Sequence, residues 1–327
     1  MKAVTVENLV KKFDDFTAVD NISFDIDEGE IFGLLGPNGA GKSTTISILA
    51  TMADPTSGKA LVDGHDIARD EDGVRKSIGI VFQDQSLDEE LTAWENMDFH
   101  GRLYRIPADI RNERIQELLE LVGLYDRKDD LVKTFSGGMR RRLEIARGLL
   151  HRPKVLFLDE PTLGLDPQTR NYLWEYIEKL NSDYGISVII TTHYMEEADR
   201  LCRRIGIIDR GRIVALDTPE NLKNSIGGDL ITVKSPEFRD KLSGLDQPWI
   251  DNIECYDGFF TISLSNAEEH LTAVIGKLIE NGIEISSVAV HKPTLEDVFL
   301  HYTGKTIRDA EADAKDRLRM MRHMRRH

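Results

Sequence analysis

The sequence contains no long apolar run and very few cysteines. No stretch reaches the roughly 18 uninterrupted apolar residues of a membrane-spanning helix, so we expect no such helix. The first residues, MKAVTVENLVKKFDDF, lack the apolar core and small-residue cleavage site of a signal peptide, which argues against a secretory leader. Cys202 and Cys255 fit neither a metal nor a disulfide spacing, which predicts reduced thiols in a cytosol.

The chain also lacks an excess of basic residues. It has 57 Asp and Glu against 42 Lys and Arg, and its formal net charge is −15. This charge argues against a nucleic-acid partner, because broad nucleic-acid binding uses a basic face. The exception is the C-terminus, where every charged side chain from Arg317 to Arg326 is basic. We expect a solvated tail there, and the alternative is a basic amphipathic helix that contacts anionic lipid or acidic protein surface.

Two domains and a tail are expected from the length and from a change of pattern along the chain. Strands alternate with helices through the first part, which predicts a mostly parallel sheet covered by helices. Hairpins expected at 59–67 and 204–216 add an antiparallel portion. Beyond Gly227 the pattern becomes that of a small α+β domain. The predicted domains are 1–225 and 229–305, followed by a basic tail, 306–327.

Local patterns also place individual elements. Residues 93–122 read as helical with an interruption near Pro107. In the small domain, strands are expected at 230–233, 259–264 and 283–290, with helices at 267–281 and from Thr294.

The strongest chemical motif is GPNGAGKST, which follows a short buried strand and precedes a helix. It matches the phosphate-loop pattern G-x-x-x-x-G-K-[ST] in the context that the motif requires. The glycines let backbone amides turn toward phosphate oxygens, Lys42 supplies positive charge, and the Ser43 hydroxyl can bind Mg²⁺. The predicted nucleotide-binding residues are Gly36, Pro37, Asn38, Gly39, Ala40, Gly41, Lys42, Ser43 and Thr44.

Further polar residues follow other buried strands. VLFLDE ends in Asp159, predicted to hold Mg²⁺, and Glu160, predicted to be the general base for an attacking water. Gln83 and His193 follow two more strands. Gln83 is predicted to bind Mg²⁺ or orient water, and His193 is predicted to contact the γ-phosphate. Their shared place at the carboxyl ends of strands favours a ligand site. Taken singly, Gln83, His193 and Asp166 (in the turn PTLGLDP) are each more typical of a surface or capping residue than of a catalytic one.

A second glycine-containing loop, KTFSGG (133–138), opens an amphipathic helix. Such a helix N-terminus favours an anion through its free N–H groups and dipole. The loop lacks the lysine that a self-sufficient phosphate site would use, so its anion is not explained by this chain alone.

Taken together, these motifs resemble the nucleotide-binding subunit of ABC transporters over roughly residues 3–225. GPNGAGKST resembles the Walker A motif, VLFLDE the Walker B motif, and FSGGM (135–139) the signature. Gln83 resembles the Q-loop residue, Gly164–Asp166 the D-loop, and His193 the switch histidine. The resemblance implies a P-loop NTPase fold: a RecA-like α/β core, an antiparallel β subdomain and a helical subdomain, here followed by the small C-terminal domain.

The resemblance also implies roles for single residues. Phe13 matches the position of the aromatic that stacks on adenine; Phe16 is the fallback, and a core role for Phe13 stays open. The resemblance implies that Ser136, Gly137 and Gly138 contact ATP bound to a second copy in a head-to-tail dimer. Two positions depart from the family pattern, Phe135 for Leu and Met139 for Gln, and Met139 cannot reproduce the hydrogen bonds of an amide.

Three further segments indicate which group of ABC ATPases the sequence resembles. MRRRLEIARGL (139–149), TLEDVFLHYTGK (294–305) and DEELTAWENMDFHGRLY (88–104) resemble daunorubicin-resistance-type ATPases of the type-two exporter class. For residues 88–104 the resemblance implies a docking region for the membrane subunit, although the aromatic side chains of this segment could also belong to a helical core. Arg140–Arg142 is expected to be a solvated helix face.

The resulting prediction is an ATPase that uses ATP and Mg²⁺ as the nucleotide-binding subunit of an ABC exporter. The resemblance implies separate membrane-spanning permease subunits and a cytoplasmic location, peripheral on the inner face of the cell membrane. The alternative is a non-transport ABC ATPase that acts on ribosomes or DNA. The transported molecule is not predicted by this sequence.

Overall fold

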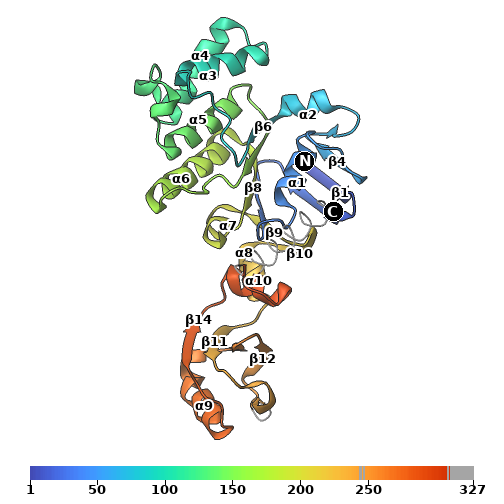
Figure 1. Ribbon diagram of the computed structural model, residues 1–327, viewed down its shortest axis with the longest axis vertical. Helices are drawn as coiled ribbons and strands as arrows, with labels where there is room; N and C mark the ends of the chain where they lie inside the picture. The colour runs from blue at the N-terminus through green and yellow to red at the C-terminus, as the bar shows by residue number, and fades with distance from the viewer. Residues whose placement is uncertain (243–244, 246, 308, 310–327) are drawn as a thin grey trace, which may run out of the picture. The chain divides into compact units, whose positions relative to one another are not determined.

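The computed structural model describes residues 1–242, 245, 247–307 and 309 (Figure 1). It divides into two compact units, Met1–Ile213 and a second that begins at Val214. The predicted basic run from Arg317 to Arg326 lies outside the described residues. Among the residues that are described, no helix has both the length and the apolar character needed to cross a bilayer.

The first unit contains an antiparallel sheet with the strand order β2-β1-β4-β5. Its strands are β1 (Lys2–Phe13), β2 (Phe16–Asp27), β4 (Ser57–Val62) and β5 (His65–Asp66). The hairpin predicted at 59–67 is confirmed: β4 and β5 pair through a turn in which Asp63 and Gly64 both have positive φ, 49° and 78°. That turn geometry matches the twist of the flanking strands.

A six-stranded sheet carries the order β10-β9-β3-β8-β7-β6. The strands are β3 (Ile31–Leu35), β6 (Ile78–Val81), β7 (Val155–Asp159), β8 (Ser187–Thr192), β9 (Arg204–Asp209) and β10 (Arg212–Asp217). From β9 to β6 the neighbours run parallel. Every residue of β3, β7 and β8 is buried, as the continuous apolar runs of strands covered on both faces require. The register pairs Leu35 with Thr192 and Asp159 with Thr191, so these strands end at one edge.

Seven helices of the first unit are described. They are α1 (Lys42–Leu49), α2 (Glu71–Ser77), α3 (Ala93–Leu103), α4 (Ala108–Leu121), α5 (Gly137–Leu149), α6 (Pro167–Tyr184) and α7 (Met195–Leu201). The predicted interruption at Pro107 is confirmed, because Pro107 is the N-cap of α4. α3, α4 and α5 pack on one another, and α5 packs against β6 (Figure 1). This helical segment therefore meets the parallel sheet through α5.

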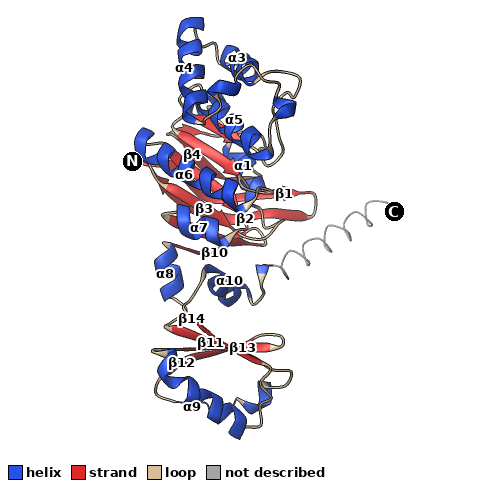
Figure 2. Cartoon of the chain, turned by 90° about the vertical axis from the view of Figure 1, so that its left-hand side faces the viewer, coloured by secondary structure: helices blue, strands red, loops and turns tan. Residues whose placement is uncertain are grey.

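The second unit contains the antiparallel sheet β12-β13-β11-β14 and the helices α8 (Pro219–Asn224), α9 (Ala267–Glu280) and α10 (Leu295–Thr303). The strands are β11 (Asp229–Lys234), β12 (Ile250–Cys255), β13 (Phe259–Leu264) and β14 (Ser287–His291). α9 covers one face of this sheet (Figure 2). The strand predicted at 283–290 is wrong at its start: Ile283 is buried in the core, but the strand begins at Ser287. α10 begins after Thr294, as predicted, with a capping box between Thr294 and Asp297.

Candidate functional site

The phosphate-loop residues connect β3 to α1 at the edge where the parallel strands end. The Gly36 N–H donates to Thr192 O at 3.2 Å, which ties the loop to the end of β8. Gly41 caps α1 with φ of 110°, a conformation that side chains other than glycine rarely adopt. The first N–H groups of α1 therefore lie beside the ends of β7 and β8.

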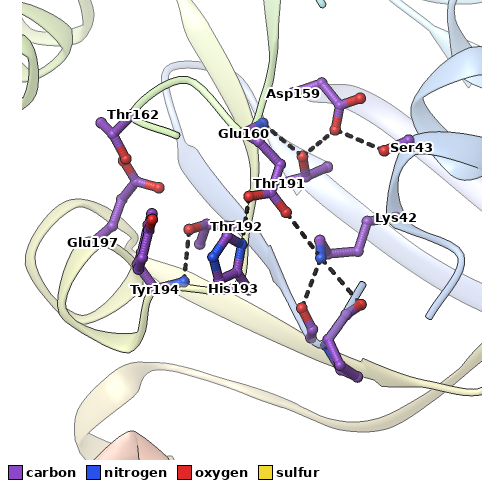
Figure 3. A network of polar contacts seen from close by, with 12 residues as sticks. Lys42, Ser43, Asp159, Glu160, Thr162, Thr191, Thr192, His193, Tyr194 and Glu197 are labelled. Atoms are coloured by element: carbon purple, nitrogen blue, oxygen red, sulfur yellow. Dashed lines mark hydrogen bonds and ion pairs between the residues drawn. The ribbon is translucent and has the colours of Figure 1, made fainter. Parts of the chain in front are cut away.

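Lys42 is buried and fully hydrogen-bonded in the loop. Its Nζ donates to Gly36 O at 2.7 Å and Pro37 O at 3.2 Å, and it lies 3.0 Å from Glu160 Oε1 (Figure 3). Only 4% of the residue is exposed. A buried ammonium requires such partners, because an unpaired charge in this environment is costly. The loop thus holds the lysine charge directly opposite the carboxylate that follows β7.

Asp159 brings together oxygen atoms suited to a hard cation. Its Oδ1 accepts from Ser43 Oγ at 3.0 Å and also from Thr191 Oγ1 (Figure 3). Carboxylate and hydroxyl oxygens fit Mg²⁺, which uses few protein ligands and takes the remainder from phosphates and water. In the described part of the chain no group of three or more His, Cys, Asp or Glu side chains could hold a metal. The donor set therefore fits a nucleotide-bound cation better than a dedicated metal cage.

Glu160 is held in place by its backbone and by two cationic or polar partners. Its φ of 49° turns the chain sharply off the end of β7, and its N–H donates to Thr191 O and Thr191 Oγ1, each at 3.1 Å. Glu160 Oε2 lies 2.5 Å from His193 Nδ1. Burial alone would raise the pKa of this carboxyl group, but His193 and the Lys42 charge outweigh burial, so the Glu160 pKa is lowered. Glu160 is therefore an ionised acceptor at neutral pH.

A second buried carboxylate, Glu197, lies on α7, the helix that follows His193 in the chain. Glu197 Oε1 accepts from Thr162 Oγ1 at 2.8 Å and from Trp174 Nε1 at 2.9 Å. Burial raises the pKa of Glu197, and these donors oppose that shift. Figure 3 shows Thr162 and Glu197 beside the loop that carries His193.

The signature residues stand at the N-terminus of α5. Ser136 is the N-cap, and its side chain accepts from the Met139 N–H at 3.3 Å. Ser136 and Gly137 are exposed, whereas Gly138 is buried. A Cβ at Gly138 would lie 2.3 Å from Thr169 Cγ2 on α6, so this position requires glycine. Ser136 and Gly137 therefore place the N-terminus of α5 at the surface.

The structure does not bring the remaining predicted residues into contact with this group of side chains within the described part of the chain. Gln83 is exposed just after β6, and Asp166 caps α6 by accepting from the Thr169 N–H at 3.0 Å. Phe13 is 46% exposed with Lys11 Nζ 4.9 Å from its ring centroid, and Phe16 is 38% exposed. A core role for Phe13 is therefore wrong. Phe99, in the region expected to dock a membrane subunit, is also exposed.

One expectation about α5 is wrong, and several polar residues at the site were not predicted. Arg141 is buried, so Arg140–Arg142 is not a solvated face. Residues 138, 141, 145 and 148 recur at helical spacing and are all buried, and this period could have revealed Arg141. Thr191 could have been found as a hydroxyl ending a buried strand. Thr162 and Glu197 give no such signal.

Comparison with known proteins extends over nearly the whole chain. Residues 19–163 match the family model "ABC transporter", and residues 218–303 match "ATP-binding protein DrrA1-3-like, C-terminal domain". The chain is 40% identical to the linearmycin resistance ATP-binding protein LnrL of Bacillus subtilis (strain 168), over 93% of this chain and 99% of that protein. It is 39% identical to the daunorubicin resistance ATP-binding protein DrrA3 of Streptomyces coeruleorubidus, over 95% and 98%.

Solved structures match about two thirds of the chain. cbiO1 from Clostridium perfringens, described as part of the ABC transporter complex cbiONQ, matches with a TM-score of 0.63 and 31% identity, over 68% of this chain and 90% of that one. The ATP-binding cassette MJ0796, solved as a dimer in a post-hydrolysis state with ADP and Pi, matches with a TM-score of 0.59 and 30% identity, over 66% and 98%.

Proposed function

The chain belongs to the ATP-binding subunits of ABC transporters, in the group of daunorubicin- and linearmycin-resistance ATPases, and from this premise we propose how its residues carry out the work. As a member of this group it hydrolyses ATP to energise export. The fit of residues 218–303 to the resistance-protein C-terminal family favours transport over an ATPase that acts on ribosomes or DNA.

We propose that residues 36–44 bind the phosphates of ATP. The first N–H groups of α1 and the Lys42 ammonium face the ends of β7 and β8, where a phosphate chain would lie. Lys42 would exchange its contacts with loop carbonyls and Glu160 for phosphate oxygens. Ser43, Asp159 and Gln83 would hold Mg²⁺, which neutralises phosphate charge when bound. Exposed Phe13 on β1 is proposed to stack on adenine.

We propose that Glu160 is the general base. Lys42 and His193 keep Glu160 ionised before ATP binds, and the contact with His193 remains when Lys42 turns to the phosphate oxygens, so Glu160 can accept a proton from the attacking water. His193 orients that carboxylate and would contact the γ-phosphate. Water adds to the γ-phosphorus, the bond to the bridging oxygen of ADP breaks, and phosphate leaves. The observation that carries this assignment is the Lys42–Glu160–His193 arrangement at one strand edge.

The signature is proposed to act on the ATP of a second copy. Ser136 and Gly137 are exposed, and the hydrogen bonds of Ser136 stay within its own helix. A relative, MJ0796, is described as dimeric with ADP and Pi bound. A head-to-tail dimer would place Ser136, Gly137 and Gly138 of each copy over the nucleotide of the other.

We further propose that this dimer drives separate permease subunits from the cytoplasmic side of a membrane. The relative cbiO1 is described as part of a transporter complex, which supports this assembly. In this proposal residues 1–225 form the ATPase domain, residues 229–305 form an accessory domain, and exposed Phe99 on α3 belongs to the permease-docking region.

The general-base assignment is tested with Glu160→Gln. This variant should bind ATP with near-normal affinity, because the amide keeps the shape of the side chain, but its turnover should fall by at least about 100-fold. The measurements are nucleotide binding by fluorescence titration and steady-state phosphate release. Glu178→Gln, a change at an exposed glutamate on α6, is the matched control and should leave both unchanged. Near-normal hydrolysis by Glu160→Gln would contradict the assignment.

A further inference from the structure

Arg141 on α5 binds backbone carbonyl groups at the carboxyl ends of β6 and β7. The residue is 7% exposed. Its Nε donates to Pro161 O at 2.9 Å, one terminal nitrogen donates to Asp159 O at 2.8 Å, and the other donates to Phe82 O. Asp159 O and Pro161 O flank Glu160, and Phe82 O directly precedes Gln83. One guanidinium thus binds the backbone beside both the predicted base and the Q-loop residue.

Glu144, one helical turn from Arg141 on α5, binds both Arg141 and the segment that follows Gln83. Its Oε2 lies 3.0 Å from Arg141 and its Oε1 accepts from the Ser86 N–H at 2.8 Å. Glu144 is 1% exposed. Arg147, a further turn along α5, donates to Ser86 O at 2.7 Å. Side chains of α5 therefore hold the segment around Gln83 at both ends, residues 82 and 86.

The chemistry of Arg141 and Glu144 indicates that they position the backbone beside Glu160 and Gln83, rather than contributing to stability alone. A buried ion pair contributes little net stability, because desolvation offsets the attraction between the charges. The planar guanidinium spreads its donors over three nitrogens and so reaches carbonyl groups of two separate segments in a fixed geometry, whereas lysine has all its donors on one nitrogen. Arg141 thereby fixes the backbone on each side of the residue that activates water.

We infer that Arg141, braced by Glu144, is a positioning residue that joins the signature helix, the Q-loop and the Glu160 backbone into one unit. The inference rests on the proposed function. Any shift of α5, whose N-terminus carries Ser136, is then transmitted to Gln83 and Glu160 together. Binding of the signature to a nucleotide is in this way coupled to placement of the base.

The test uses Arg141→Lys and Glu144→Gln in the full chain, with Arg142→Lys as the matched control. Arg142 lies on the same helix but donates to Val122 O, which directly follows α4, rather than to the backbone around Glu160 or Gln83. The measurements are kcat and KM for ATP hydrolysis, nucleotide affinity, the thermal midpoint of unfolding, and kcat of Arg141→Lys combined with Gln83→Ala.

Arg141→Lys should lower kcat by about 10- to 100-fold, because misplacement of a catalytic group by about 1 Å has effects of this size. Nucleotide affinity and KM should stay within about threefold, and Glu144→Gln should show the same pattern with a smaller loss. The loss caused by Arg141→Lys should shrink in the Gln83→Ala background, because both changes act through the Q-loop. If Arg141→Lys does not fold, Glu144→Gln carries the same comparison.

The inference is overturned if kcat stays within about twofold of wild type, if kcat and nucleotide affinity fall together, or if the losses of Arg141→Lys and Gln83→Ala multiply fully. These failures differ from failure of the proposed function. In the latter case Glu160→Gln would retain turnover, whatever the Arg141 variants do.

Discussion

At the residue scale, the site depends on contacts that the fold makes between side chains and backbone groups of separate segments. Lys42, Glu160 and His193 come from three segments far apart in sequence. Glu160 is held by Thr191 at the end of β8, Lys42 by the carbonyl of Gly36, and His193 by Glu160 itself. Glu160 and His193 can be predicted because each stands directly after a recognisable apolar strand, and Lys42 because it belongs to the phosphate-loop motif. Their mutual contacts cannot, since the parallel register that aligns the strand ends is a property of the folded sheet.

Gly138 gives a prediction about packing beneath the signature. Gly138→Ala should place a Cβ 2.3 Å from Thr169 Cγ2, which forces α5 and α6 apart. Overpacking of this kind costs about 1–3 kcal/mol, so the midpoint of thermal unfolding should fall. Thr169→Ser, added to Gly138→Ala, removes the obstructing methyl group and keeps the hydroxyl that bonds Asp166. The double variant should recover most of the lost stability.

The control for this experiment is Thr169→Ser alone, which should change stability little. If Gly138→Ala is as stable as wild type, or if Thr169→Ser gives no recovery, the contact between Gly138 and Thr169 does not set the glycine requirement. Scanning calorimetry of the four proteins provides the comparison.

At the element scale, Arg141 shows where sequence patterns fail. Three consecutive arginines suggest a solvated face, whereas the helical period of α5 places Arg141 in line with buried Gly138, Ile145 and Gly148. Arg141 binds backbone carbonyl groups of other segments, and no pattern of side chains in the sequence reveals these partners. The strand β12 was missed for a different reason: half of its residues, including Asp251 and Asn252, are exposed without strict alternation.

The contact between α3 and the end of α5 predicts acid sensitivity. Burial, followed by the charge of Arg147, lowers the pKa of His100 on α3 to about 4. His100 lies beside the rings of Tyr104 and His151, whose centroids are 5.0 Å and 6.2 Å away. An unfolded histidine titrates near pH 6.5, so protons bind the unfolded chain first as the pH falls. Stability contributed by neutral His100 is therefore present above pH 6.5 and is lost toward pH 4.

Urea unfolding at pH 7 and pH 5 tests this expectation. Wild type should lose about 2 kcal/mol from His100 between these values, and His100→Phe should lose correspondingly less. His151, whose pKa is also lowered by burial, contributes in the same direction and remains in the variant. Between pH 8 and pH 7 the two proteins should keep a constant difference. An equal loss in both proteins between pH 7 and pH 5 would contradict the assignment.

At the scale of the whole molecule, we propose that the loop FSGGM acts on a second copy rather than on its own chain. In this proposal Lys42 and Glu160 supply the charge and the base on one side of the nucleotide, while Ser136 and Gly137 are exposed at the end of α5. The change of pattern near Gly227 predicts a second domain from residue 229, whereas the second compact unit of the structure begins at Val214. The proposed enzyme therefore has two composite sites, each using residues of both copies.

Mixing two inactive variants tests this claim most directly. Lys42→Ala disables the phosphate loop and Ser136→Glu disables the signature by adding negative charge where phosphate is expected. In a mixed dimer one site carries both defects, and the other combines an intact phosphate loop with an intact signature. Equimolar mixing should therefore restore ATP hydrolysis that neither variant shows alone. A mixture that remains as inactive as its components, although the two variants associate, would contradict a site shared between two copies.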